Sequence, residues 1–244
     1  MTEFSSLERQ AAEFADEVTD TVNAVSPNCS PFVAKAIQDG SRFTVSQTPA
    51  EGVPLNVDEK PLLSMTARYW CTVDRAKRFL AVERSDIAVY PGAKARGEPL
   101  FRYEYLREAR DVPAAHIQVH GHRDALSHVL SRSGTSTNRG KRRATGDDIP
   151  RMSELHLPVG GHRFRPCLED ILEMLLDEFG IDGAAESRAT LHSGRKRWRM
   201  TQTSSAVRDD PDSAVSVLKE LGYHIQVADG EDAPPTNESR LTAR

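Results

Sequence analysis

The chain has 244 residues, of which 38% are hydrophobic and 28% are charged, and its formal net charge is −4. This length accommodates one large domain or two small ones. No apolar stretch of about 18 residues is present, so the sequence predicts no membrane span. The negative net charge excludes a general attraction to nucleic acid, and any such binding must come from a local basic patch.

The N-terminus and the cysteines bear on where the protein resides. The sequence beginning at Met1 lacks the basic start and apolar core of a secretory signal. Its three cysteines, Cys29, Cys71 and Cys167, are odd in number and far apart, which indicates reduced thiols and not a disulfide framework or a zinc knuckle. We therefore expect a cytoplasmic protein without a cofactor.

The first third of the chain predicts a helix followed by a short strand and a loop. Hydrophobic residues recur every three to four positions from Ser6 to Ala24, which is typical of an amphipathic helix, and Pro27 would end it. Arg42 to Gln47 is predicted to be a short strand. Thr48 to Pro61 holds three prolines and a glycine and is predicted to be a loop.

Four further β-prone runs follow, separated by turn residues. Because no helical pattern of about ten residues intervenes, they predict an antiparallel meander and not parallel βαβ units. The runs are Leu62 to Asp74, Arg78 to Tyr90, Leu100 to Glu108 and Ala115 to His120.

The second half of the chain is predicted to be mainly helical. Ser131 to Arg151 has almost no apolar residues and is predicted to be a mobile loop. Pro166 opens a helix that continues to Phe179, and Gly180 suits its C-terminal cap. The remaining predicted elements are a helix at Glu186 to Arg208, a helix framed by Pro211 and Gly222, a final strand at Tyr223 to Val227, and a disordered tail from Asp229.

These elements predict an α+β fold. A central antiparallel sheet of about five strands is covered by the N-terminal helix and by the C-terminal helices. Residues 1–130 hold the N-terminal helix and the sheet, and residues 131–153 form the mobile loop. Residues 154–228 hold a histidine- and arginine-bearing segment with the helices that complete the same domain, and residues 229–244 form the disordered tail.

Five of the eight histidines lie in two short segments, Ala114 to His122 and Leu155 to Pro166. Histidine changes charge near neutral pH and is the commonest metal ligand, so these segments are the candidate functional site. In the first segment, strand alternation places His116 and His120 on one face and the intervening apolar residues in the core. The strand from Phe101 to Tyr105 is also two-faced, and either its aromatic or its charged row can border the histidines.

The second segment combines features of an anion site. Gly160 and Gly161 allow a tight turn, and Arg163 and Arg165 follow His162 at alternate positions. The free amides at the start of the following helix favour a phosphate group. The segment therefore predicts a phosphate pocket.

Three interpretations of the histidines remain open. They are ordinary polar side chains on a sheet, or ligands of a metal, or the base and acid of a metal-independent phosphodiester cleavage. RNA supplies its own nucleophile, the 2′-hydroxyl, so the third interpretation requires no serine or cysteine. The candidate catalytic residues are His116, His120, His156 and His162, with Arg163 and Arg165 for the developing phosphorane charge.

One resemblance to a known family rests on the order of these motifs. A Phe-Arg-Tyr-acidic strand (Phe101 to Glu104), a histidine-bearing segment and a later histidine and proline stretch span Leu100 to His162. This order resembles the small toxins of TumE-type toxin–antitoxin pairs, in which a strand of Arg-Tyr-Asp character precedes paired histidines. The present chain is longer and lacks adjacent histidine pairs. The resemblance implies an RNase-like toxin with a cognate antitoxin.

A second candidate surface is a basic cluster with an aromatic residue inside it. The residues Arg195, Lys196, Arg197 and Trp198 offer phosphate contacts and a ring for stacking on a base. The alternative is a solvated helix face with Trp198 turned into the core. The sequence has no P-loop, Gly-x-Gly-x-x-Gly, Gly-x-Ser-x-Gly or His-Glu-x-x-His motif, which disfavours the enzyme classes that use them.

The sequence thus favours a nucleic-acid-directed protein, with a metal-independent endoribonuclease toxin of a defence or toxin–antitoxin pair as the candidate activity. The expected partners are RNA and an antitoxin or another protein, and no membrane. Two alternatives come from other classes. One is a non-catalytic interaction or regulatory protein that uses its helical ends, and the other is a metal- or small-ligand-binding domain.

Overall fold

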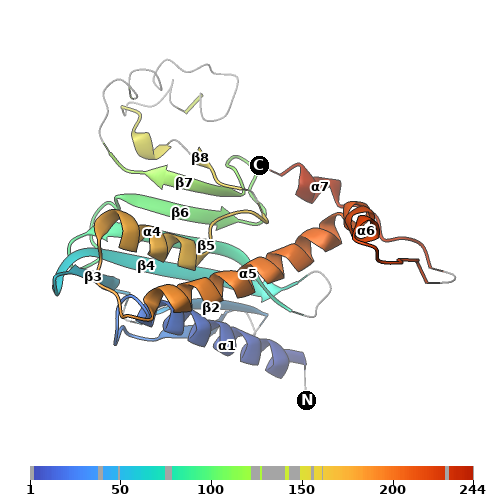
Figure 1. Ribbon diagram of the computed structural model, residues 1–244. Coiled ribbons are helices and arrows are strands. Elements are labelled where there is room, and N and C mark those ends of the chain that lie inside the picture. The colour runs from blue at the N-terminus through green and yellow to red at the C-terminus, as the bar shows by residue number, and fades with distance from the viewer. Residues whose placement is uncertain are drawn as a thin grey trace.

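A computed structural model describes residues 3–37, 41–48, 50–74, 79–121, 127, 141–142, 149–154, 157–160, 162–228 and 231–243. The chain has an α+β fold in which an antiparallel sheet is covered by helices on one of its faces (Figure 1). The predicted fold class is confirmed. No helix in the described ranges has the length and apolar character needed to cross a membrane.

Within the described ranges the sheet has eight strands in the order β1-β2-β4-β5-β6-β7-β8, with β3 paired to β4 beside β2, and each of these pairs is antiparallel. The four predicted runs and the predicted strand at Arg42 are all strands of this sheet. The strands are β1 (Phe32–Ile37), β2 (Arg42–Gln47), β3 (Val53–Val57), β4 (Lys60–Val73), β5 (Leu80–Pro91), β6 (Phe101–Leu106), β7 (Ala115–Val119) and β8 (Leu157–Pro158).

Strand β4 is the longest of these strands and pairs with two others along one of its sides. Its first half pairs with β3 and its second half with β2, so these two strands share one side of β4. The prediction of a loop at Thr48 to Pro61 is therefore wrong over β3. Pro54 is compatible with a strand there because β3 pairs on one side only, and an edge position does not require every backbone amide.

The described helices follow the sequence pattern closely. They are α1 (Glu3–Asn23), the 3₁₀ turn η1 (Met152–Glu154), α4 (Leu168–Phe179), α5 (Ser187–Asp209), α6 (Pro211–Glu220) and α7 (Glu238–Leu241). Gly180 ends α4 in the left-handed conformation, with a φ of 61°. The Asp210 side chain accepts a hydrogen bond from the Ser213 amide at the start of α6.

Two predictions at the C-terminal end need correction. Tyr223 to Val227 is not a strand, because the segment lies on the surface and pairs with no strand in the part of the chain that the structure describes. The predicted disordered tail contains α7, whose preceding residue Asn237 donates a backbone hydrogen bond to the Asp209 carbonyl. The predicted mobile loop at Ser131 to Arg151 lies almost entirely outside the described residues.

The core lies between one face of the sheet and the helices α1, α4 and α5, which all lie in front of the sheet in Figure 1. Side chains alternate along β4, so Met65, Tyr69 and Cys71 point toward the helices and are buried. The Phe14 ring of α1 meets the Tyr69 ring edge-on at 5.1 Å. The intervening residues, including Trp70, therefore project from the opposite face.

Candidate functional site

His116 is a buried residue on the sheet face opposite the helices. The β6–β7 register places it across from Glu104, and its Nε2 lies 3.3 Å from Glu104 Oε2. Its Nδ1 lies 2.9 Å from the carbonyl oxygen of Pro113. The hydrogen bond with His116 is the main cause that lowers the pKa of Glu104. The charged row of β6, and not its aromatic row, therefore borders this histidine.

His162 lies on the other face of the sheet. Its Nδ1 is 3.1 Å from the hydroxyl of Tyr105, whose ring faces the helices, and the side chain is 6% exposed. Burial, together with the charge of Arg240 from α7, whose guanidinium lies 3.1 Å from Nε2, lowers its pKa to about 4. His162 is therefore a neutral imidazole at physiological pH.

The predicted two-histidine acid–base site is not formed by the histidines that can be placed. Tyr105 pairs with Ala115, and the side chain of the next residue, His116, points to the opposite face. His162 contacts Tyr105, so the sheet separates it from His116. His156 lies outside the described residues.

His120 directly follows the last residue of β7, at the end of the strand away from Ala115. Its Nδ1 lies 2.9 Å from Glu98 Oε1, and its backbone amide donates to the Leu100 carbonyl. It lies five positions along the chain from Ala115, which corresponds to about 16 Å in a strand. His120 and His162 therefore cannot serve one acid–base site, because each would have to reach the same reacting group.

The predicted phosphate pocket around His162 is replaced by internal contacts. Arg163 Nε lies 2.6 Å from Asp209 Oδ2. Arg165 donates to the His162 carbonyl, and its Cζ lies 3.8 Å from the Tyr105 ring centroid and 5.6 Å from that of Trp198. Burial lowers the pKa of Arg165 to about 10. Both arginines hold the segment against the body of the protein through these contacts.

The turn before these arginines depends on a glycine. Gly160 has a φ of 84°, and a Cβ at this position would overlap the backbone of Phe164. The Phe164 amide donates to the Gly160 carbonyl and closes the turn. The sequence therefore predicted the turn correctly, while the directions of the two arginines depend on α5.

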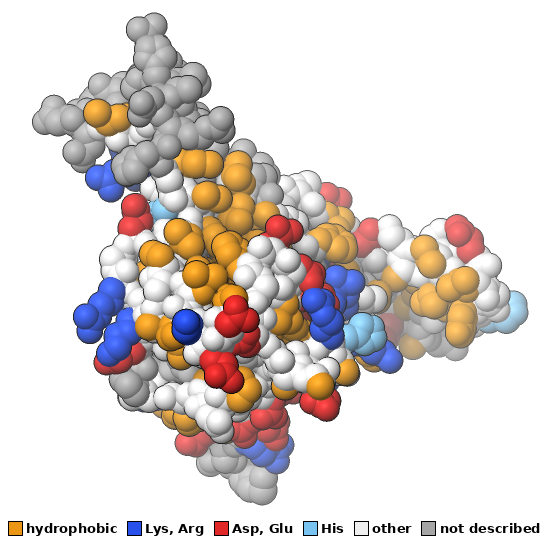
Figure 2. Space-filling view, turned by 60° about the vertical axis from the view of Figure 1, so that its left-hand side comes forward, with side chains coloured by type: hydrophobic (Ala, Val, Ile, Leu, Met, Phe, Trp, Pro, Cys, Tyr) orange, Lys and Arg blue, Asp and Glu red, His pale blue; other side chains and the backbone are white. Residues whose placement is uncertain are grey.

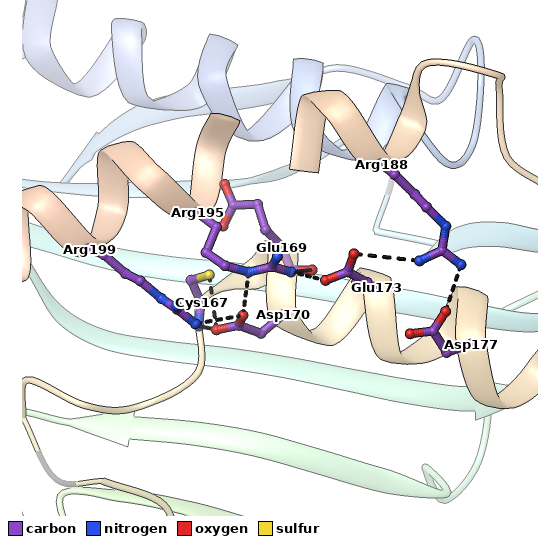
Figure 3. Close-up of polar contacts among 8 residues, drawn as sticks. All are labelled: Cys167, Glu169, Asp170, Glu173, Asp177, Arg188, Arg195 and Arg199. Carbon is purple, nitrogen blue, oxygen red and sulfur yellow. Dashed lines mark hydrogen bonds and ion pairs between the residues drawn. The ribbon is translucent and has the colours of Figure 1, made fainter. Parts of the chain in front are cut away.

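The basic residues of α5 form a ladder of ion pairs with α4 (Figure 3). Arg195 lies 2.6 Å from Asp170 through its Nε and also contacts Glu173. Arg188 lies 2.6 Å from Asp177, and Arg199 lies 3.6 Å from Asp170. The acidic partners recur at positions 170, 173 and 177, a helical stripe in the sequence that the prediction of a phosphate site did not use.

A groove of about 600 Å³ runs along one face of α5. Its lining residues follow helical spacing, so they belong to one face, and none of them is acidic. Lys196 in this lining is exposed and has no hydrogen bond or ion pair within the described part of the chain. The lining comprises His192, Arg195, Lys196, Arg199, Met200, Thr203 and Ser204.

The two remaining members of the predicted basic cluster lie away from this groove. Arg197 is exposed, and Trp198 is half-buried beside Arg165. Trp198 is therefore turned toward Arg165, but it does not belong to the hydrophobic core. Within the predicted cluster, Arg195 and Lys196 line the groove and Trp198 supports the packing of Arg165.

The end of the chain forms an exposed lobe around α6. None of the α6 residues is buried, and hydrophobic side chains lie on the surface of the lobe at the right of Figure 2. Val217, Leu221 and Tyr223 are among the exposed hydrophobic residues. This surface is the feature that an interaction protein would use, and that alternative remains a prediction.

No group of three or more potential metal ligands occurs among the residues that the structure places. The buried thiol of Cys167 lies 3.2 Å from Asp170 Oδ2 at the start of α4, and burial raises its pKa.

Family models, curated proteins and solved structures were compared with the chain, and none of them matches. The resemblance to TumE-type toxins therefore rests on its short motifs alone.

Proposed function

We propose that the protein binds nucleic acid, and that the groove along α5 holds the phosphate backbone. The observation that carries this proposal is the groove itself, which is lined by Lys196, Arg195 and Arg199 without an acidic residue. Helix α5 has six Lys and Arg residues and one acidic residue, in a chain whose net charge is −4. This local patch is what a protein of negative net charge requires for nucleic-acid binding.

The side chains in the groove suit phosphate oxygens. Lys196 and Arg199 supply exposed donors, while Thr203 and Ser204 add hydroxyl groups. Twelve residues separate the ends of the lining, which corresponds to about 18 Å along the helix. Several consecutive phosphates fit this length, because the spacing along one strand of duplex DNA is about 3.4 Å.

Binding, and not cleavage, is what these contacts support. The cleavage hypothesis needs a base and an acid within reach of one phosphodiester. His116 and His162 lie on opposite faces of the sheet, and His116 is fully buried. The proposed activity is therefore recognition of a nucleic-acid backbone, with RNA as the first candidate.

The test is fluorescence anisotropy of a labelled single-stranded RNA, measured between about 50 and 200 mM salt. The double variant Lys196→Gln with Arg199→Gln removes two cations from the groove. We expect weaker binding and a salt slope smaller by about 1.4, because each phosphate contact on a single strand contributes about 0.7. The matched control is Arg188→Gln, which lies on the same helix outside the groove and should leave the slope unchanged.

Two results would contradict the proposal. One is wild-type protein without salt-dependent binding to RNA or DNA. The other is a double variant that binds as wild type does, because the groove would then contribute no phosphate contact. Incubation of the RNA with the protein in EDTA, followed by gel analysis, separately measures metal-independent cleavage.

A further inference from the structure

The sheet face opposite α1, α4 and α5 carries a polar row across three strands. The registers place Arg68 opposite Asp86, Trp70 opposite Arg84, and Asp86 opposite Glu104. These side chains share a face because cross-strand partners project from the same side of a sheet. The face is therefore continuous from β4 through β5 to β6, and the helices of the core lie behind it.

Trp70 is the aromatic centre of this row. The Arg84 Cζ lies 4.7 Å from the Trp70 ring centroid, and the Arg68 Cζ lies 5.7 Å from it. On the β2 side of β4, the cross-strand partners are small, with Thr44 opposite Trp70 and Ser46 opposite Arg68. A half-buried indole with two guanidinium groups near its ring thus has short hydroxyl side chains as its cross-strand neighbours on β2.

The charges on this face favour an anionic ligand. Arg84 lies 3.3 Å from Glu104 and 3.6 Å from Asp86, and Arg102 lies 3.5 Å from Asp86. These two carboxylates are shared among Arg84, Arg102 and His116. Arg68 is exposed and makes no ion pair with any residue that the structure places. A positive charge next to an aromatic ring therefore remains available at the outer end of the row.

We infer that this face binds single-stranded nucleic acid, with a base stacked on Trp70 and the adjoining phosphate at Arg68. Aromatic residues on an open antiparallel sheet stack on bases only where those bases are unpaired, and arginine beside them holds the backbone. The inference rests on the proposed function for the ligand class and adds a second surface. Because α5 lies on the other side of the sheet, the two surfaces can be tested separately.

The fluorescence of Trp70 can report whether a base is stacked on its ring. The chain has two tryptophans, so Trp198→Phe leaves Trp70 as the single indole fluorophore. Titration with oligouridylate should quench its fluorescence in a saturable manner. Inorganic polyphosphate, which has charge but no bases, should leave it unquenched, and so should a blunt duplex RNA of the same length.

Substitutions at the face separate stacking from general polarity. Trp70→Leu should weaken oligouridylate binding about tenfold, whereas Trp70→Phe should retain most of it, because stacking contributes about 1–3 kcal/mol per base. Arg68→Gln, made in the Trp198→Phe protein, should shift the quenching midpoint to higher oligouridylate. Arg9→Gln, an exposed arginine on α1, is the matched charge control and should leave the midpoint unchanged.

The outcomes distinguish this inference from the proposed function. Quenching that persists when Lys196→Gln and Arg199→Gln are added supports the Trp70 surface even if the α5 groove binds nothing. Groove-dependent binding without quenching of Trp70 overturns this inference alone. Equal quenching by polyphosphate and by oligouridylate also overturns it, because no base would then be stacked.

Discussion

The imidazole of His116 and the carboxylate of Glu104 join two neighbouring strands, with 3.3 Å between Nε2 and Oε2. The second ring nitrogen of His116 lies 2.9 Å from the carbonyl of Pro113, so the same side chain also fixes the turn before β7. Glu104 in turn contacts Arg84 on β5. A residue that the sequence marked as catalytic is thus a structural link across three strands.

His116→Ala should destabilise the protein by about 2 kcal/mol or more. The substitution leaves a cavity and removes partners from the half-buried Glu104 carboxylate and the Pro113 carbonyl. Urea unfolding measures the change. The exposed His192 is the matched control, and its replacement by alanine should change the free energy of unfolding by less than about 0.5 kcal/mol. Equal effects of the two substitutions would mean that the His116 contacts contribute nothing.

The depressed pKa of His162 predicts a loss of stability in mild acid. The unfolded chain binds a proton at this histidine below about pH 6.5, whereas the folded protein binds it only near pH 4. Between these values the unfolded state holds more protons, so the free energy of unfolding falls as the pH is lowered. The added slope is at most about 1.4 kcal/mol per pH unit.

His162→Asn tests this dependence, because the other seven histidines are the same in both proteins. Urea unfolding between pH 4 and 7 should give a steeper pH dependence for the wild type than for the variant. Parallel curves for the two proteins would show that His162 does not titrate differently on folding.

The sequence pattern was sufficient for α1, α4, α5 and α6 and for the face of His116, whereas α7 was missed. Pro166 and Gly180 frame α4 as expected. Alternation along β7 correctly predicts that His116 and Ile117 project from opposite faces of the sheet. Strand β3 was missed because Pro54 and Gly52 resemble loop residues, and only pairing with β4 makes the segment a strand. Local patterns predict the other parts of this region well, whereas β3 becomes recognisable only through the hairpin in which Val57 pairs with Lys60 of β4.

The candidate site was harder to predict because it depends on contacts between distant segments. Whether Arg165 faces solvent or the Tyr105 ring depends on where α5 lies, and sequence spacing does not contain that information. The same holds for Arg195, whose partners lie 22 and 25 positions earlier on α4. Charged residues on helices that pack together tend to pair with each other, so a basic cluster alone does not identify a phosphate site.

The ladder between α4 and α5 should depend mainly on Arg195. Its side chain is only 15% exposed and contacts both Asp170 and Glu173, so Arg195→Ala should cost about 1–2 kcal/mol (Figure 3). Arg188 is 59% exposed, and Arg188→Ala should cost less than about 0.5 kcal/mol, because exposed ion pairs contribute little. Thermal and urea unfolding of the two variants provide the comparison. A larger loss of stability for Arg188→Ala than for Arg195→Ala would show that the ladder does not depend mainly on Arg195.

Gly194→Ala should destabilise the protein although alanine favours helices. In an open helix the substitution gains about 1 kcal/mol. Here a Cβ at Gly194 would overlap the Glu169 carboxylate, which is packed against this turn of α5, and overpacking of this kind costs about 1–3 kcal/mol. Glu169→Ala removes the obstacle, so adding Gly194→Ala to that variant should raise the free energy of unfolding. Urea unfolding of the four proteins in this cycle gives the coupling between the two positions, and a stabilising effect of Gly194→Ala by itself would contradict the close packing of α4 on α5.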